Sequence, residues 1–339
     1  MKWKNRRSIL FALTFLTCLF SNCNAQNAPK NTSLQLSETI ILPDVSGRID
    51  HMAFDQKNKV AFVAALGNNT IEVVDLTSGK VTHTIKNLKE PQGIIYIPES
   101  NTLVVTNGKN GECVFFDAAT FHKISSIQLG DDADNIRYDA TTRKIYVGYG
   151  NGGIAIIDAS TFKLISQIKL SAHPEAFQIN HSTNKMYVNV PDAHLIEVID
   201  LNKNAVLAQW KITEAKANFS MALDESNQRL FIGCRHPSKL LVLDTETGKT
   251  ISSIVIDGDA DDIFFNNNTK EIYVTCGAGY VDVITQNGAN NYKTNRKIKS
   301  KPGARTSLFI PELSLLIVAA PATINNNAQL MIYKSLELN

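Results

Sequence analysis

The stretch Asp244–Thr285, DTETGKTISSIVIDGDADDIFFNNNTKEIYVTCGAGYVDVIT, decides the fold, because the rest of the chain repeats its pattern. Short apolar runs alternate in it with turn residues, and it leads from one apolar triplet, VLD, to another, VIT. Equivalent triplets end at Asp75, Asp117, Asp158, Asp200 and Asp244. The distances between successive ends are 42, 41, 42 and 44 residues. Two more copies end at Thr285 and Tyr333. Seven copies of a unit of about 42 residues, each with four short strand-like runs, predict an all-β, seven-bladed β-propeller with four-stranded antiparallel blades.

The last repeat lacks one strand. After an apolar run near 328–333, only six residues remain. Glu38–Leu42 (ETIIL) precedes Asp50 in the way that SSIVI precedes Asp261, which makes it the candidate for the missing outermost strand. We therefore expect this N-terminal strand to complete the seventh blade and to close the ring, because closure removes exposed strand edges.

The first 25 residues have the pattern of an export signal. A positive segment, MKWKNRR, precedes a 12-residue apolar segment at 9–20, which is shorter than the ~20 residues that span a membrane. We expect cleavage after Ala25; the alternatives are a lipoprotein modified at Cys23 and a retained anchor. Each alternative places the protein outside the cytoplasm, periplasmic or secreted. The mature chain is then expected to be a monomer without a transmembrane span, with a polar tether at 26–36 and the propeller at 37–339.

Charge and cysteine usage exclude several classes of protein. Of the 34 Lys and Arg residues, four lie in the N-terminal segment, so 30 remain against 32 Asp and Glu, and no basic field is left to bind nucleic acid. Cys234 and Cys276 occupy the same position in adjacent repeats. Packed sheets stand ~10 Å apart whereas a disulfide needs Cα atoms within ~7 Å, so we expect no bridge between them, and Cys113 is left over. The sequence contains no CxxC, GxSxG, HExxH, P-loop or dinucleotide motif.

The Asp that recurs at the end of a strand begins a turn, as in DLTSGK, DAATFHK, DASTFK and DTETGK. A carboxylate at this place accepts hydrogen bonds from the backbone N–H groups of its own turn. We therefore assign these aspartates a structural role and no chemistry.

The positions that start the innermost strand of each blade are the most informative. There is one in each repeat, 41 to 44 residues apart, and we call them the mouth ring: Asp50, Gln92, Asp134, Glu175, Phe219, Asp261 and Arg305. The next position is also polar or small in every repeat: His51, Gly93, Asn135, Ala176, Ser220, Asp262 and Thr306. The third position is mostly apolar. Innermost strands line the central channel of a propeller, so we expect the polar positions to surround one channel mouth and the apolar ones to pack between blades.

The carboxylates expected at the mouth repel one another, because like charges held close together disfavour joint ionisation. Three solutions remain open: Arg305 and His51 neutralise some of them, water fills a wide channel, or a divalent cation binds. Carboxylate and amide oxygens suit Ca²⁺ or Mg²⁺. The candidate ligands are Asp134, Glu175, Asp261 and Asp262. Other residues expected to reach the same mouth are His173, Asn218 and Arg235.

Four strand segments, IYVTCG, MYVNVP, LVVTNG and IYVGYG, resemble the YVTN repeat family. The resemblance covers roughly residues 40–335, and the chain is most similar in type to the YncE-like exported propellers of that group. It implies seven blades and an extracytoplasmic location. The wider group includes lactonase-like members, surface proteins and propeller subunits of periplasmic dehydrogenases. No catalytic motif of any of them is found in this sequence.

Three functions follow as hypotheses. The first is a binding or scaffold propeller without catalysis, whose mouth takes a polar small molecule, a peptide or a partner protein; the missing catalytic motifs favour it. The second is a metal-assisted hydrolase or lactonase, in which a cation at the mouth polarises a carbonyl and lowers the pKa of a water. His51 or His173 would then move the proton. The third is a subunit of a periplasmic redox system.

Overall fold

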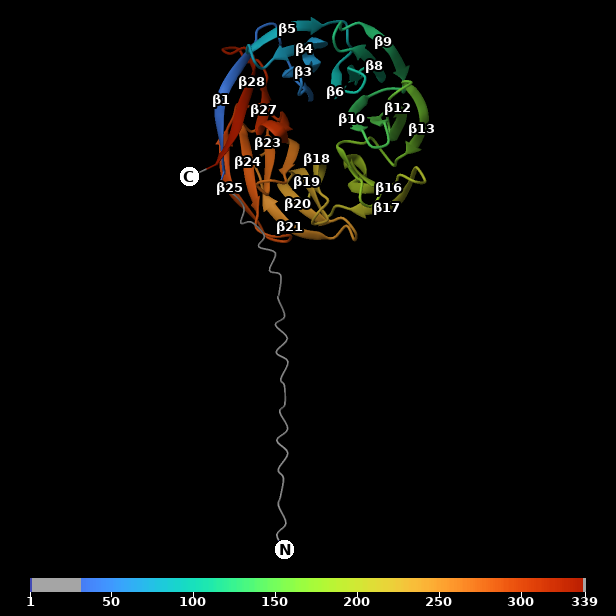
Figure 1. The fold of residues 1–339 in the computed structure, drawn as a ribbon, viewed down its shortest axis with the longest axis vertical. Coiled ribbons are helices and arrows are strands. Elements are labelled where there is room, and N and C mark those ends of the chain that lie inside the picture. Colours follow the sequence, from blue (N-terminus) through green and yellow to red (C-terminus); the bar gives the residue numbers. More distant parts are fainter. Residues whose placement is uncertain (2–31, 338–339) are drawn as a thin grey trace.

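The computed structural model describes Met1 and residues 32–337, and it is all-β. Seven four-stranded antiparallel sheets surround a common axis as the blades of a propeller (Figure 1), as the repeat predicts. The predicted signal segment and most of the predicted tether lie outside the described residues. No helix in the described part of the chain has the length and apolar character that would let it cross a membrane.

The strands of each of the first six blades follow one another in chain order. Blade one contains β2 (Met52–Asp55), β3 (Val60–Ala65), β4 (Thr70–Asp75) and β5 (Lys80–Ile85). Blade two contains β6 (Pro91–Ile97), β7 (Thr102–Asn107), β8 (Glu112–Asp117) and β9 (Lys123–Gln128). Blade three contains β10 (Ala133–Asp139), β11 (Lys144–Tyr149), β12 (Gly153–Asp158) and β13 (Lys163–Lys169).

The second half of the ring repeats this arrangement. Blade four contains β14 (Phe177–Asn180), β15 (Lys185–Val190), β16 (Leu195–Asp200) and β17 (Ala205–Lys211). Blade five contains β18 (Lys216–Asp224), β19 (Arg229–His236), β20 (Ser238–Asp244) and β21 (Thr250–Val255). Blade six contains β22 (Ala260–Asn266), β23 (Glu271–Cys276), β24 (Tyr280–Gln286) and β25 (Tyr292–Lys299). Single 3₁₀ turns occur at η1 (Leu66–Asn68), η2 (Pro191–Ala193) and η3 (Pro311–Leu313).

Blade seven is closed by the two ends of the chain, as predicted. It consists of β26 (Thr306–Ile310), β27 (Leu315–Ala320), β28 (Ala328–Glu337) and β1 (Thr32–Leu42), with β1 outermost. β1 pairs with β28 from Thr32 opposite Glu337 to Leu42 opposite Ala328, with one irregularity near Ser37. β1 therefore begins inside the stretch predicted as tether, and residues 32–36 belong to the blade instead.

The burial of the strands explains why this pattern of residues forms blades. The second and third strands are almost wholly buried, as in β7, because neighbouring blades cover both faces. The outermost strands alternate exposed and half-buried residues, as in β21. The core lies between blades: Phe62 of blade one, for example, packs with Ile94 and Leu103 of blade two.

Two structural expectations from the sequence are confirmed. Cys113, Cys234 and Cys276 are buried free thiols, and no disulfide joins the described residues. The recurring aspartates hold their own turns: Asp158 Oδ1 accepts the N–H of Thr161 at 2.7 Å, and Asp117 Oδ1 accepts the N–H of Thr120 at 2.8 Å.

Candidate functional site

The mouth ring gathers carboxylates from distant blades around one opening. Asp50, Asp134, Glu175 and Asp261, from blades one, three, four and six, all act on the same guanidinium, that of Arg48. Burial lowers the pKa of Arg48, but these four carboxylates together raise it above its ordinary value. The four side chains thus lie within electrostatic reach of one guanidinium, although they come from four different blades.

A second ring of residues, two positions before the mouth ring, was not predicted as a set. Its members are Arg48, Glu90, Asp132, His173, Ala217, Asp259 and Gly303. Five of them have positive φ: Glu90, Asp132, Ala217, Asp259 and Gly303. Only His173 was singled out from the sequence. The other members could have been found from the sequence, because the positions two residues before the mouth ring repeat with the same spacing of 41 to 44 residues.

One side of the mouth is a closed ion-pair network. Arg235 pairs with Asp261 and, at 3.3 Å, with Asp259, and its guanidinium carbon lies 4.0 Å from the centre of the Phe219 ring. Arg305 pairs with the same two carboxylates, at 3.1 Å to Asp261 and 3.2 Å to Asp259. Burial raises the pKa of Asp261 even so. Because these four groups pair with one another, the described residues on this side of the mouth offer a cation no unpaired carboxylate.

His51 lies between the buried Asp50 and the half-buried Asp262. Its ring nitrogens are 3.6 Å from Asp50 Oδ1 and 3.7 Å from Asp262 Oδ1. Burial disfavours the imidazolium, but Asp262 and Asp50 outweigh it and raise the pKa of His51. Asp262 Oδ2 accepts the backbone N–H of Ser307 at 2.7 Å, and burial raises the pKa of this carboxyl to about 6. Asp50 Oδ2 lies 2.7 Å from Arg48 Nη2.

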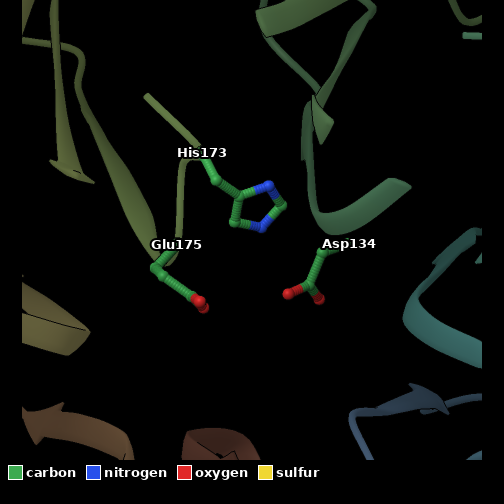
Figure 2. A group of neighbouring side chains, drawn as sticks. All are labelled: Asp134, His173 and Glu175. Carbon is green, nitrogen blue, oxygen red and sulfur yellow. The ribbon is translucent and has the colours of Figure 1, made fainter. Parts of the chain in front are cut away.

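The other side of the mouth holds Asp134, His173 and Glu175, whose donor atoms all lie within 4.8 Å of one another. Figure 2 shows the His173 ring above the gap between the two carboxylates. Asp134 is only 8% exposed, and its Oδ1 has no hydrogen-bond partner among the described residues. Burial, and then the charge of Asp50, raise the pKa of Asp134 to about 7. Burial, and then Asp134, raise the pKa of Glu175 well above its ordinary range.

The tautomer of His173 suits it to bind a cation. His173 Nδ1 lies 2.7 Å from the carbonyl oxygen of Gly150, and this contact requires the proton on Nδ1. Nε2 then carries a free lone pair. Ligands about 2.1 Å from a tetrahedral ion lie ~3.4 Å apart, so donor atoms within 4.8 Å reach that geometry by a shift of about 1 Å.

The predicted four-carboxylate metal set does not come together in the described residues. Asp134 and Glu175 meet, and His173 joins them, but Asp261 is paired with arginines and Asp262 is held by Ser307. The remaining predicted residues have local partners or are buried. Gln92 donates to Asp132 Oδ1 at 3.2 Å, and the buried Asn135 leaves its Oδ1 without a hydrogen bond.

Asn218 is fully buried and does not face the mouth as a free group. Its amide donates to Asn189 Oδ1 at 3.0 Å and to the carbonyl of Leu195 at 3.1 Å, which ties blade five to blade four.

Below the mouth, an axial cavity of about 520 Å³ continues into the channel. Its wall contains His51, Asp261 and Asp262 from the mouth, followed by apolar third-position residues such as Met52 and Ile94. These apolar residues were predicted to pack between blades, and they do, but they line the channel as well.

Comparison with known proteins shows the fold alone. No protein-family model matches the chain, and no curated protein matches it. A chain of hydrazine synthase from Kuenenia stuttgartiensis superposes with a TM-score of 0.75 at 15% identity, over 85% of this chain and 96% of the other. A chain of the mitotic checkpoint complex superposes with a TM-score of 0.75 at 13% identity, over 97% of this chain and 99% of the other. The seven-bladed propeller is thus shown, and propellers commonly serve as binding or scaffold modules.

Proposed function

We propose that the protein is an exported binding propeller of the YVTN type whose channel mouth holds a divalent cation on Asp134, His173 and Glu175. The observation that carries the proposal is the buried, unpartnered Oδ1 of Asp134, which lies in a cluster with a histidine and a second carboxyl group. The buried Asp134 and the half-buried Glu175, whose pKa values are both raised, are costly to ionise together. A cation between them removes that cost.

The donor set favours one class of ion. One imidazole nitrogen with two carboxylates suits Zn²⁺ or Mn²⁺ better than the all-oxygen sites of Ca²⁺ and Mg²⁺. Three protein ligands leave a coordination position for a ligand atom. The bound molecule is therefore a polar small molecule, a peptide end or a side chain of a partner protein that supplies an oxygen or nitrogen donor.

Calorimetry on the purified mature chain, freed of metal with EDTA, tests the site. We expect one Zn²⁺ per chain and a melting temperature that rises with free Zn²⁺, because the ion binds only the folded form. Asp134→Asn and His173→Gln should each weaken binding by more than about 100-fold, since disturbing even the support of a ligand costs ~10–100-fold. His181→Gln is the matched control, because His181 is an exposed histidine. Unchanged Zn²⁺ affinity in Asp134→Asn would overturn the site.

Export is tested separately. We infer an extracytoplasmic location from the N-terminal segment, with Gln26 as the first mature residue or a lipid on Cys23. Fractionation of a bacterial host and mass spectrometry of the mature N-terminus distinguish these two outcomes from a full-length protein retained in the cytoplasm, which would contradict export.

Metal-assisted hydrolysis is the second candidate function, because a three-ligand site with an open position can bind and activate a water. It is tested with simple lactones and the Zn²⁺ form. Turnover that disappears in Asp134→Asn would favour hydrolysis, and Zn²⁺ binding without turnover would favour the binding propeller.

A further inference from the structure

The axial cavity contains a cationic side chain, Arg137, that takes no part in the ion pairs of the mouth. Arg137, on β10, lines the cavity three residues beyond Asp134, about 10 Å deeper along the strand. Its Nη1 donates to the carbonyl of Ile136 at 2.8 Å, and its guanidinium carbon lies 5.5 Å from the centre of the Phe177 ring. No carboxylate among residues 32–337 forms an ion pair with it, unlike Arg48, Arg235 and Arg305 of the mouth.

Because Arg137 has no ion-pair partner among the described residues, its guanidinium is free to bind an anionic ligand. A guanidinium carries five N–H donors, and among the described residues only the carbonyl of Ile136 accepts one. Burial lowers the pKa of Arg137, and the carboxylates of Asp262 and Asp134 only partly counter this. Arg137 is half-buried, and a cation in such a place whose donors are mostly unused is satisfied best by a planar anion that accepts two parallel N–H groups.

The wall around Arg137 is largely apolar and aromatic. Third-position residues surround it on several blades: Met52, Ile94, Ile136, Met221 and Ile263. Counted from the mouth ring as the first position, Phe54, Tyr96 and Tyr138 of the wall lie at the fifth position, and Phe264 and Leu308 at the fourth. The cavity thus has an acidic end at the mouth and an aromatic end away from it. An apolar wall with one fixed charge is typical of sites for small organic ions.

We propose that the axial cavity binds a small organic carboxylate, with the acid group on Arg137 and the apolar body against the third-position side chains. The cavity volume of about 520 Å³ lies within the range of small-molecule sites, roughly 300–1,000 Å³. This inference does not depend on the cation site, because Arg137 is not part of it.

Phenylacetate is a suitable probe, with phenylacetamide as its uncharged counterpart. By calorimetry on the EDTA-treated mature protein, we expect phenylacetate to bind at one site per chain. Phenylacetamide should bind more weakly by about tenfold or more, because it cannot form the charge-assisted pair. Arg137→Met should remove this preference for the acid, and Arg137→Lys should retain part of it, because a lysine is a point charge without the bidentate fork.

Two controls separate this site from the rest of the molecule. Lys163→Met removes an exposed positive charge from the outer strand of the same blade and should leave phenylacetate binding unchanged. Asp134→Asn should abolish Zn²⁺ binding but keep phenylacetate binding. The cation site and the carboxylate site are thus tested independently of each other. The inference is overturned if phenylacetate does not bind the wild-type protein in a saturable way. Equal affinities for acid and amide in the wild type would overturn it too, and that comparison needs no variant to fold.

Discussion

Asp282 is a carboxyl group buried beside a second carboxyl group. Its side chain is fully buried, its Oδ2 accepts the N–H of Asp257 at 2.7 Å, and Lys297 pairs with Asp257 at 2.9 Å. Burial raises the pKa of Asp282, and the neighbouring Asp257 side chain adds to this. Asp257 Oδ2 and Asp282 Oδ1 have no other partner in the described chain, so a proton held between the two groups satisfies both.

Asp282→Asn should therefore stabilise the protein at alkaline pH. A carboxyl whose pKa is raised on folding binds its proton more tightly in the native state, so the wild type loses stability as pH rises above about 4. Asn does not titrate and keeps an oxygen acceptor for Asp257. Thermal melts should show the variant more stable by about 1–2 kcal/mol at pH 8 and nearly equal at pH 4.5. Asp44→Asn, at an exposed position, is the control; a difference that is the same at both pH values would contradict the shared proton.

Gly93 occupies the second position of blade two because a neighbouring strand leaves no room. A Cβ there would lie 2.0 Å from the carbonyl oxygen of Asp134 and 2.6 Å from Thr106 Oγ1. Thr106 Oγ1 also donates to that carbonyl, at 2.6 Å. Gly93→Ala should lower the free energy of unfolding by roughly 2 kcal/mol or more in urea titrations, because overpacking shifts backbone as well as side chains. Gly258→Ala should change the free energy of unfolding little, because a Cβ there would lie 3.8 Å from its nearest neighbour. If both variants lose the same free energy of unfolding, the close approach at Gly93 does not explain its effect.

Which residues share the mouth could be predicted from the sequence, but how they pair could not. The spacing of the repeats fixes the angular position of Asp50, Asp134, Glu175 and Asp261, because each lies at the beginning of the innermost strand of its blade or up to two residues before it. The pairing depends on the approach to those strands, where residues such as Asp259 adopt positive φ. The spacing of the repeats carries no information about that backbone conformation. It offers Asp261 as a possible metal ligand, whereas in the structure Arg235 and Arg305 pair with this carboxylate.

At the scale of the element, the inner hairpin of most blades is held by a buried Asp or Asn at the end of its first strand. These residues are Asp55, Asp139, Asn180, Asp224 and Asn266. Asp139 is 4% exposed; its Oδ1 accepts the N–H of Thr141 at 2.9 Å and its Oδ2 accepts the Thr142 hydroxyl at 2.6 Å. The side chain thus accepts two hydrogen bonds from the residues of its own turn.

Asp139→Ala should cost about 1–3 kcal/mol of unfolding free energy, because two accepted hydrogen bonds are lost and each contributes roughly 0.5–1.5 kcal/mol. Asp139→Asn should cost less than half as much, because Asn180 and Asn266 fill the same place in blades four and six and accept backbone N–H groups there. Urea denaturation of the three proteins gives the comparison. If the asparagine variant loses as much stability as the alanine variant, the negative charge rather than the accepted hydrogen bonds holds the turn.

The sequence predicts the existence of the strands better than their ends. In blade five the apolar and β-branched residues predict strands at 219–223 and 229–234. The observed strands β18 and β19 are longer and pair from Asp224 opposite Arg229 to Lys216 opposite His236. The pairing passes an irregularity between Asn218 and Ser220. Such an irregularity breaks the alternation of apolar and polar residues on which a strand prediction rests, so the prediction stopped there.

At the scale of the whole molecule, the ring is held shut by hydrogen bonds between its two ends. β1 is the only strand of blade seven that comes from the N-terminal side of blade one, and it pairs with β28 along its length. Leu34, Ile40 and Leu42 of β1 are 4%, 1% and 0% exposed. Leu34 packs beside blade six and Ile40 beside blade one, so the same strand joins the last blade to both of its neighbours.

A chain that begins at Pro43 should therefore be much less stable than one that begins at Thr32. Burial of the three β1 side chains is worth about 2 kcal/mol each, and the lost strand pairing adds to this. At roughly 2–4 °C per kcal/mol for a large domain, the melting temperature should fall by about 10 °C or more. The chain beginning at Thr32 is the control for removal of the N-terminal residues alone and should melt with the mature protein. Equal melting of the two truncated chains, measured by circular dichroism in the same buffer, would mean that β28 alone closes the ring and that the outer strand only covers it.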